Sequence, residues 1–501
     1  MILDGNSLSI SDVCASARDA AGVVAVTLAP SAVARMQASR DVVDRLASGD
    51  APIYAVNTGV GLLSNVRISG LDLDQLQRNV IRSHAVGVGD PLPREVVRAM
   101  MLIRANVLAK GYSGIRPVVA QRLCDLLNRG VTPVVPSQGS VGASGDLAPL
   151  AHMALVLVGE GEAEFQGEIL SGSGALSLAG VAPIDLHAKE AVSLINGTQA
   201  MLAVGCLELE AAETLAASAD VVCALSLDAL RGSSRAFDPR LHAVRPHPGQ
   251  SAVAARLHGL LEDSEIRRSH ATCGRVQDAY SLRCTPQVHG PVRDALAEAR
   301  RVFAIELNSA TDNPLVFGGP DQDAILSGGN FHGESLAFQF DFLAVALTAL
   351  AGVSERRIDR LVNPYLNEEL PAFLAAHPGL ESGLMMAQVT AASLVAENKV
   401  LASPASTGSI TTSGNKEDFV SMGMTSALKF QRVVRNTRLV LAIETLAAAR
   451  GLDLLLPLKS SPELETYRAR IRAVSPPITA DRPFHKDIQS LATLISTGAL
   501  R

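Results

Sequence analysis

The stretch INGTQAMLAVGCLELEAAETLAASADVVCALSLDAL, residues 195–230, decides the fold class. Apolar residues recur in it through about ten helical turns, and its few glycines all lie in the first third. Similar periodicity follows in PVRDALAEARRVFAIELNS (291–309) and GESLAFQFDFLAVALTALAGVSERRIDRLV (333–362), and a further pair of helices is expected within residues 423–451. Long helices packed side by side predict a mainly α protein with a central long-helix bundle.

The composition favours the same fold. Of the 501 residues, 48% are hydrophobic but only 3% are aromatic, and the chain has no Trp. The apolar content is therefore Ala, Leu and Val, which suits close helix–helix packing. The formal net charge is −6 and neither sign forms a long block, so we expect no nucleic-acid partner.

The chain shows no repeat or linker that would separate independent parts. Residues from about 51 to 200 are rich in Gly and Pro, and functional side chains usually lie on such loops. We expect an N-terminal domain over residues 1–200 with the substrate-binding loops, a central helical bundle over 201–454, and a helical cap over 455–501.

The compartment is expected to be the cytoplasm. Six Cys residues lie far apart without CxxC spacing, which argues against a disulfide framework or a zinc site. The N-terminus lacks the basic flank and apolar run of a signal peptide. The apolar run 343–353 is too short to span a bilayer, so no membrane association is expected. His152, His289 and His332 are scattered and are interpreted as structural, so no metal is predicted.

A second stretch, GSVGASGDLAPLAH at residues 139–152, places three nearly side-chain-free residues before an apolar helical pattern. One interpretation is a turn with Ser144 or Asp146 as the helix N-cap. A phosphate loop and a nucleophile elbow do not match the pattern. Another interpretation is chemical: if the Gly145 nitrogen attacks the Ala143 carbonyl carbon, a five-membered ring closes. Loss of two waters, one from the ring and one from Ser144, would leave an electrophilic methylidene group.

Eight motifs, in order, decide between these interpretations. They are YAVNTGVGLLSNVRI, RSHAVGVGD, GSVGASGDLAPLAHM, LINGTQA, VQDAYSLRCTPQVHG, NSATDNPLVF, SGGNFHGE and TTSGNKEDFVSMG. Together they resemble the histidine and aromatic amino-acid ammonia-lyases over nearly the whole chain. The resemblance implies a mainly α ammonia-lyase-like fold, a 4-methylideneimidazol-5-one made from Ala143, Ser144 and Gly145 without an external cofactor, and a homotetramer with active sites shared between subunits.

The resemblance also implies roles for single residues, each of which has an ordinary structural alternative. Elimination of ammonia needs an electrophile for the amine and a base for a weakly acidic β-hydrogen. Tyr54 matches the family's base, although a Tyr in such a loop is usually a packing residue. Arg283 would pair with the substrate carboxylate, although a salt bridge is the usual role of an Arg. The remaining implied residues lie near the ring, promote its closure, or hold it and the substrate: Asn196, Asp146, Gln277, Tyr280 and Phe331. If helical, Gln277 and Tyr280 would share a face.

Two positions indicate the amino acid. Ser83-His84 is similar to the pair found in the histidine-selective members, and an imidazole substrate needs a hydrogen-bonding partner such as His84. Glu417 would face the same imidazole, where aromatic lyases have a Gln-type residue. The expected substrate is L-histidine and the expected product is trans-urocanate.

Departures from the family pattern, in the Tyr54 loop and in SITTSGNKED (409–418), leave alternatives open. Ala55 and Val60 replace Gly and Phe in the Tyr54 loop, and Lys416 adds a positive charge beside Glu417. These changes are compatible with another aromatic amino acid or a histidine derivative such as ergothioneine. An aminomutase, which would return ammonia to the β-carbon, also remains open, since retention of ammonia depends on loop closure. A catalytically silent relative would be expected to lack Ser144, Tyr54 or Arg283.

Overall fold

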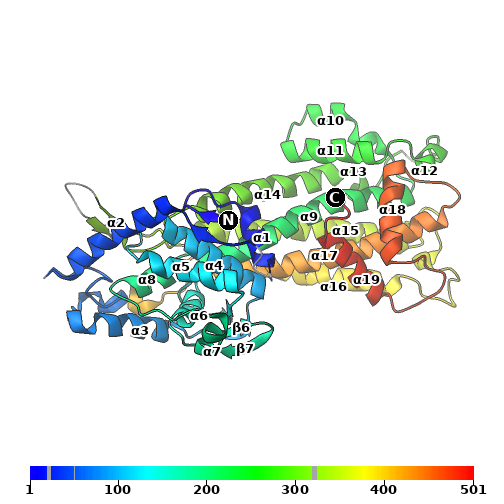
Figure 1. Ribbon diagram of the computed structural model, residues 1–501. Helices are drawn as coiled ribbons and strands as arrows, with labels where there is room; N and C mark the ends of the chain where they lie inside the picture. The colour runs from blue at the N-terminus through cyan, green and yellow to red at the C-terminus, as the bar shows by residue number, and fades with distance from the viewer. Residues whose placement is uncertain (20–23, 50, 275, 319–323) are drawn as a thin grey trace. The chain divides into compact units, whose positions relative to one another are not determined.

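The computed structural model describes residues 1–19, 24–49, 51–274, 276–318 and 324–501. It is mainly α, as predicted, with short strands only at the margins of the helices (Figure 1). Its contacts divide it into two compact units. Unit 1 comprises residues 1–207, 300–340 and 404–428, and unit 2 comprises 208–299, 341–403 and 429–501. The three-part domain division expected from the sequence stays a prediction.

Four long helices have residues in both units. They are α9 (Gln199–Ala229), α14 (Thr285–Leu307), α15 (Glu334–Val362) and α17 (Gly423–Leu454). The prediction of a pair of helices within 423–451 was wrong, because α17 is continuous there. No Gly or Pro occurs between Gly423 and Gly451 to interrupt it.

Unit 1 consists of helices packed around α4, whose residues from Val96 onward are all buried. The α-helices that lie wholly in unit 1 are α1 (Ile10–Arg18), α2 (Pro30–Ala47), α3 (Leu73–His84), α4 (Arg94–Ala109), α5 (Pro117–Arg129), α6 (Leu147–Leu157), α7 (Gly172–Ala179) and α8 (Glu190–Ile195). Pro30 opens α2, as its fixed φ favours at a first helical position.

Four small sheets border these helices. One joins β1 (Ile2–Leu3) to β2 (Thr27–Leu28) in parallel, and the others are antiparallel. One antiparallel sheet pairs β3 (Val88–Pro91) with β5 (Pro136–Gln138), and another pairs β8 (Leu315–Phe317) with β9 (Ala324–Leu326). The third has three strands, in which β6 (Glu162–Phe165) lies between β4 (Thr132–Pro133) and β7 (Glu168–Ser171). Two short 3₁₀ helices, η1 (Gly61–Asn65) and η2 (Gly70–Asp72), precede α3, and η5 (Ser413–Asn415) precedes α17.

Unit 2 is a helical bundle held by buried ion pairs as well as apolar contacts. Glu444 on α17 accepts hydrogen bonds from Ser226 on α9 and from Ser354 and Arg357 on α15. His289 on α14 contacts Asp220 on α9 at 2.7 Å. Beside these lie α10 (Pro239–Ala243), α11 (Pro248–Leu260), α12 (Glu265–Ser269), α13 (Tyr280–Arg283), α16 (Met385–Leu401), α18 (Pro462–Val474) and α19 (His485–Ser496), with η3 (Ser234–Phe237) and η4 (Ala372–Leu374).

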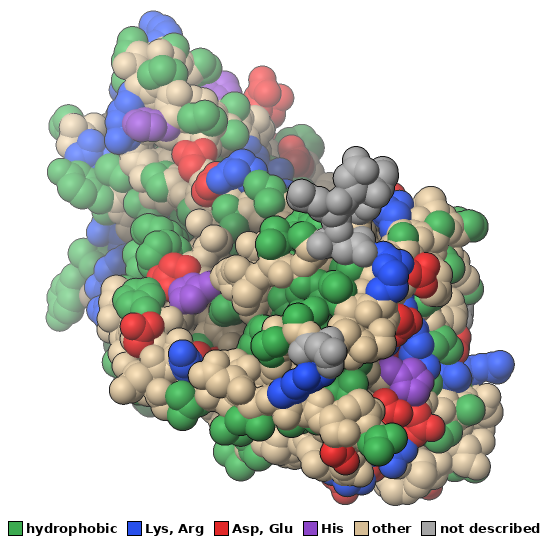
Figure 2. Space-filling view, turned by 90° about the vertical axis from the view of Figure 1, so that its left-hand side faces the viewer, with side chains coloured by type: hydrophobic (Ala, Val, Ile, Leu, Met, Phe, Trp, Pro, Cys, Tyr) green, Lys and Arg blue, Asp and Glu red, His purple; other side chains and the backbone are tan. Residues whose placement is uncertain are grey.

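By length and composition, α15 is the one helix of the described chain that could cross a membrane. The sequence prediction considered only residues 343–353, whereas the qualifying apolar window is 18 residues long. Half of that window is buried inside the protein, and core helices of soluble proteins pass the same test, so this is weak evidence for a membrane span. Lys, Arg, Asp and Glu side chains are interspersed over the face shown in Figure 2.

Candidate active site

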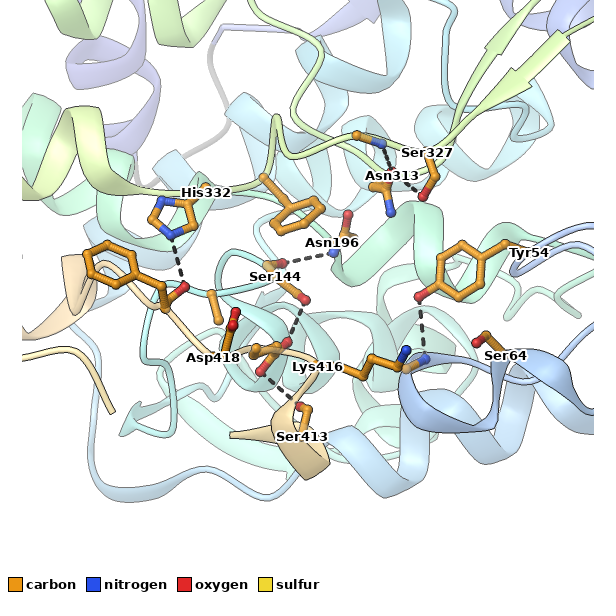
Figure 3. Close-up of a pocket in the computed structure, with 16 residues that line it drawn as sticks. Tyr54, Ser64, Ser144, Asn196, Asn313, Ser327, His332, Ser413, Lys416 and Asp418 are labelled. Carbon is orange, nitrogen blue, oxygen red and sulfur yellow. Dashed lines mark hydrogen bonds between the residues drawn. The ribbon is translucent and has the colours of Figure 1, made fainter. Parts of the chain in front are cut away.

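A cavity of about 400 Å³ in unit 1 brings together six of the residues singled out from the sequence. Its walls come from six separate stretches of the chain, at residues 54–64, 143–144, 196, 313, 327–332 and 413–419 (Figure 3). The six residues are Tyr54, Ala143, Ser144, Asn196, Phe331 and Glu417.

The Ala143–Ser144–Gly145 loop is held against the residues that follow α8. Asn196 Nδ2 donates a hydrogen bond to the Ser144 carbonyl at 2.9 Å. Gly145 forms a parallel bridge with Gly197, and the Asp146 N–H donates to the Gly197 carbonyl at 2.7 Å. A Cβ on Gly145 would lie 2.1 Å from the Gly197 oxygen, so only Gly fits there.

Asp146 is fully buried and connects this loop to the first turn of α9. Its carboxylate accepts hydrogen bonds from the Ser140 hydroxyl at 2.7 Å and from the Met201 N–H at 2.9 Å. Burial raises the pKa of Asp146 to about 6, against the lowering effect of those hydrogen bonds. The N-cap interpretation is confirmed in position, because Asp146 is the N-cap residue of α6, but its side chain makes no capping hydrogen bond there. Asp146 binds the N-terminal amides of a different helix, α9.

Glu417 faces the Ser144 hydroxyl from the loop that precedes α17. Ser144 Oγ donates to Glu417 Oε1 at 2.6 Å, while Thr412 and Ser413 donate to Oε2 at 2.6 and 2.9 Å. Burial raises the pKa of Glu417. The three hydroxyl donors and His84 lower it by more than burial raises it, so the net pKa lies below the ordinary value. Ser413, Gly414 and Asn415 all have left-handed backbones, which turn the chain tightly enough for these contacts.

Tyr54 lies in a turn on the other side of the cavity, where its hydroxyl oxygen accepts the Gly61 N–H at 3.4 Å (Figure 3). The next residue, Ala55, has φ +59°, a left-handed backbone that favours Gly. Ala55, which replaces the Gly of the family pattern, therefore has a strained backbone, but Tyr54 still reaches the cavity.

His84 and Ser83 end α3 and do not line this cavity. His84 Nδ1 lies 2.7 Å from the Val80 carbonyl, which requires a proton on Nδ1 and leaves Nε2 as the acceptor in the neutral ring. Ser83 is exposed and donates to the same Val80 carbonyl at 3.2 Å.

The structure does not bring Gln277, Tyr280 and Arg283 into the cavity of unit 1. They belong to unit 2, where Gln277 and Arg283 line a second cavity of about 450 Å³. The Arg283 guanidinium lies over the Tyr280 ring, 4.7 Å from its centroid. A shared face was expected only if one helix held both residues, and this condition is not met, because α13 begins at Tyr280 and Gln277 precedes it.

Several cavity residues were missed by the sequence analysis. Asn313 is the most informative: its Oδ1 accepts hydrogen bonds from Ser327 Oγ and the Gly328 N–H, which turns its NH₂ toward the cavity (Figure 3). Its position in the quoted motif NSATDNPLVF was the available signal. The other missed lining residues are Gly61, Ser64, Ser327, Gly328, Ser413, Asp418 and Phe419, while Lys416 and His332, singled out from the sequence for other reasons, also line the cavity.

The three histidines interpreted as structural all have structural partners. His289 contacts Asp220, His152 Nε2 accepts the Gly87 N–H at 3.1 Å, and His332 Nε2 donates to the Phe419 carbonyl at 3.2 Å. His332 nevertheless lines the cavity. Within the described residues, no group of three or more His, Cys, Asp or Glu side chains could hold a metal ion.

The chain is similar to known proteins over nearly its whole length. The family model described as aromatic amino acid lyase matches residues 8–473. A histidine ammonia-lyase of Koribacter versatilis is 59% identical over 99% of this chain and 98% of its own length. The crystal structure of histidine ammonia-lyase from Trypanosoma cruzi has a TM-score of 0.92 and 43% identity, covering 100% of this chain and 94% of that one. A tyrosine aminomutase from Streptomyces globisporus has a TM-score of 0.93 and 38% identity, covering 100% and 97%. The chain belongs to the aromatic amino acid lyase family.

Proposed function

We propose that the protein is a carbon–nitrogen lyase that eliminates ammonia from L-histidine to give trans-urocanate. The observation that carries this proposal is one cavity that presents Ser144 of an Ala-Ser-Gly loop together with Tyr54 and Glu417. The similarity to histidine ammonia-lyases over the full chain supports the choice of amino acid.

The residues present fit a 4-methylideneimidazol-5-one formed from Ala143, Ser144 and Gly145. The Gly145 backbone tolerates no Cβ, and the Ser144 carbonyl, which would be the ring carbonyl, already accepts a hydrogen bond from Asn196. Asn196 Oδ1 is buried without a hydrogen-bond partner among the described residues, so this amide can still accept from a substrate N–H. When formed, the group supplies an electrophilic carbon for the amine of the substrate.

The side chains around Ser144 would bind and deprotonate the substrate. Tyr54 removes the β-proton as the general base: its phenolate form, to which the Gly61 N–H donates, takes up the proton and becomes a neutral phenol. Glu417 is ionised at neutral pH and accepts an N–H of the substrate imidazole, while His84 Nε2 is available as a second acceptor. Asn313 donates its NH₂ into the cavity toward a substrate oxygen, and Phe331 packs beside the ring.

Arg283, Gln277 and Tyr280 would complete the site from another subunit of a homotetramer. An apolar stripe on α15 supports self-association: Phe338, Phe342 and Val345 follow helical spacing and are 47%, 65% and 51% exposed. The Arg283 guanidinium would pair with the substrate carboxylate. On this proposal the enzyme acts in the cytoplasm, without a metal or an external cofactor.

One variant and one assay test the proposal. Purified protein is incubated with L-histidine while urocanate absorbance and ammonia release are followed in the same sample. The native chain should yield both products in equal amounts and show an intact-mass deficit of two waters. Ser144→Ala should lose the deficit and the activity, because no hydroxyl remains to be eliminated. Ser64→Ala, which changes another serine of the same cavity, should keep the mass deficit. Undiminished activity in Ser144→Ala would disprove the mechanism.

A second candidate is the same chemistry on another substrate or with another outcome. Lys416 lines the cavity beside Glu417, which favours a substrate with an additional anionic group, such as a histidine derivative. The likeness to a tyrosine aminomutase favours testing for a β-amino acid product. A mass deficit of two waters without urocanate would direct the search to histidine derivatives and aryl-alanines.

A further inference from the structure

Arg104 joins the two helices that meet behind the Ala-Ser-Gly loop. This side chain of α4 is fully buried. Its guanidinium donates to the Ser193 carbonyl in α8, to the Asn196 carbonyl at 2.9 Å, and to Gln199 Oε1 at the start of α9 at 2.8 Å. One planar group therefore spans the break between α8 and α9.

That break carries the contacts to the loop. Asn196 holds the Ser144 carbonyl, and Gly197 bridges Gly145. A Cβ on Gly197 would lie 2.7 Å from Arg104 Nη1 and 2.4 Å from Gln199 Oε1. A Cβ on Gly145 would lie 2.1 Å from the Gly197 carbonyl oxygen. Arg104, Gly197 and Gly145 are thus layered in van der Waals contact, with no space between them for a side chain.

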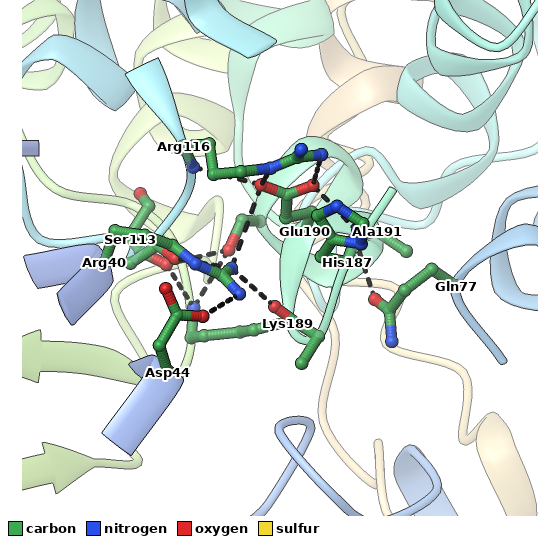
Figure 4. A network of polar contacts seen from close by, with 12 residues as sticks. Arg40, Asp44, Gln77, Ser113, Arg116, His187, Lys189, Glu190 and Ala191 are labelled. Atoms are coloured by element: carbon green, nitrogen blue, oxygen red, sulfur yellow. Dashed lines mark hydrogen bonds and ion pairs between the residues drawn. The ribbon is translucent and has the colours of Figure 1, made fainter. Parts of the chain in front are cut away.

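The rest of the network fixes the other end of α8. Lys189, directly before this helix, is fully buried and donates to the Ser113 carbonyl at 2.8 Å and to Asp312 at 3.1 Å. Glu190, the first residue of α8, pairs with Arg116 at 2.7 Å (Figure 4). Burial lowers the pKa of Arg104 to about 10, while Asp312 raises it, so the guanidinium is charged at neutral pH. These pairs anchor α8 at its N-terminal end, and Arg104 holds its C-terminal end through the carbonyls of Ser193 and Asn196.

We propose that Arg104 is a positioning residue for ring formation, which holds the Asn196–Gly197 segment against Ala143–Gly145 and so sets the rate of closure. The inference rests on the proposed function. Closure forms a bond from the Gly145 nitrogen to the Ala143 carbonyl carbon. The Gly145 amide proton passes to the Ala143 oxygen, which leaves as water with the Ser144 amide proton. The Ser144 hydroxyl then leaves as a second water with the Ser144 α-proton. The first bond requires the backbone to be compressed, and misplacement of reacting atoms by about 1 Å can cost roughly a hundredfold in rate.

Arg104→Lys tests the inference, because it retains the positive charge but replaces the planar guanidinium, which donates to three acceptors, with a single ammonium group. Arg98→Lys is the matched control. Arg98 lies on the same helix, is only 2% exposed, and likewise donates to backbone carbonyls, those of Leu127 and Ser16, which lie outside the cavity. Each full-length chain is made in a timed cell-free synthesis, and intact mass follows the fraction that has lost two waters. Circular dichroism and Tm of the purified proteins report folding.

We expect the native chain and Arg98→Lys to lose the two waters at the same rate, and Arg104→Lys to do so roughly ten to a hundred times more slowly. Equal rates for the two variants, whether both fast or both slow, would overturn the inference, because Arg104 would then act only through the stability of the core. If Arg104→Lys does not fold, Gln199→Met replaces it, since this change removes one hydrogen-bond acceptor of the Arg104 guanidinium. Gln199→Met must then lose the two waters more slowly than Arg98→Lys. A native chain without any mass deficit would instead disprove the ring itself.

Discussion

Three hydroxyl groups converge on the carboxylate of Glu417, from Ser144, Thr412 and Ser413. They lower its pKa despite its burial, so the group is an anion throughout the neutral range. Ring formation would remove the Ser144 donor and leave those of Thr412 and Ser413. Such a fixed charge can stabilise positive charge on an imidazole as a β-proton is removed, at little cost in reorganisation.

We expect Glu417→Gln to lower kcat for L-histidine by roughly a hundredfold, because the amide fills the same space without the charge. The Gln side-chain oxygen can still accept the hydroxyl donors, so Tm should change by only a few degrees. Asp418→Asn is the matched control, since Asp418 lines the same cavity at the next position. Equal losses of kcat in both variants, or a loss of Tm in step with kcat, would show that Glu417 is structural.

Asp146 should make stability depend on pH. Its pKa is raised from an ordinary value of 3.8 to about 6 by burial. The folded chain therefore binds this proton more tightly than the unfolded chain, and the free energy of unfolding falls as pH rises from about 4 to 6. Asp146→Asn removes this titration, so the difference between the two proteins should change by about 3 kcal/mol across that window and stay constant above it.

Chemical denaturation at pH 4, 5, 6 and 7 measures this difference directly. Asp228, whose pKa burial also raises to about 6, is present in both proteins, so its contribution cancels. A constant difference at all four values would show that Asp146 titrates alike in the folded and unfolded chains.

At the scale of elements, close packing explains why the long helix α9 contains a glycine, Gly205, in its first third. Gly205 lies against two aromatic rings of unit 1: a Cβ there would be 2.7 Å from Phe340 and 3.0 Å from Phe303. Those rings pack against each other, with centroids 5.3 Å apart. The helix thus gives up helix propensity at Gly205 in exchange for close packing.

The same substitution at two helical glycines should have opposite effects. Gly205→Ala should lower the free energy of unfolding by roughly 1–3 kcal/mol, because the rings must move. Gly259→Ala in α11, where nothing lies within 4 Å, should raise it by about 0.5–1 kcal/mol through helix propensity. Urea denaturation of both variants checks the pair. An increase in the free energy of unfolding of Gly205→Ala would mean that the two Phe rings can move aside at little energetic cost.

The elements also show what the sequence could and could not predict. Helical periodicity located α9, α14, α15 and α17, because apolar spacing is a local property. The destination of the Asp146 and Ser144 side chains was not predictable, since both bind partners distant in sequence, Met201 and Glu417. For the same reason the cavity position of Asn313 was missed: only the fold brings it beside Tyr54 and Asn196.

At the scale of the whole molecule, the residues implied for one reaction lie in two units of the chain. Ser144, Tyr54 and Glu417 line a cavity of unit 1, whereas Gln277 and Arg283 line a cavity of unit 2. The family resemblance implies that different subunits of an oligomer supply these two sets.

Complementation tests this sharing. Ser144→Ala and Arg283→Ala should each be inactive alone, since one lacks the electrophile and the other the carboxylate partner. Co-expressed, they should form mixed oligomers in which some sites receive an intact Ser144 from one chain and an intact Arg283 from another, and activity should return in part. Mixed oligomers without activity, verified by two affinity tags, would place both residues of each site in a single subunit.

The bond between Ser144 and Glu417 joins residues that are 273 positions apart. A ribosome adding 5–20 residues each second needs roughly 14 to 55 s to pass from one to the other. During that interval the Ala-Ser-Gly tripeptide emerges as ordinary peptide, without the wall that Glu417 provides. A nascent chain interrupted before residue 417 therefore lacks a complete pocket, and the site can be assembled only near the end of synthesis.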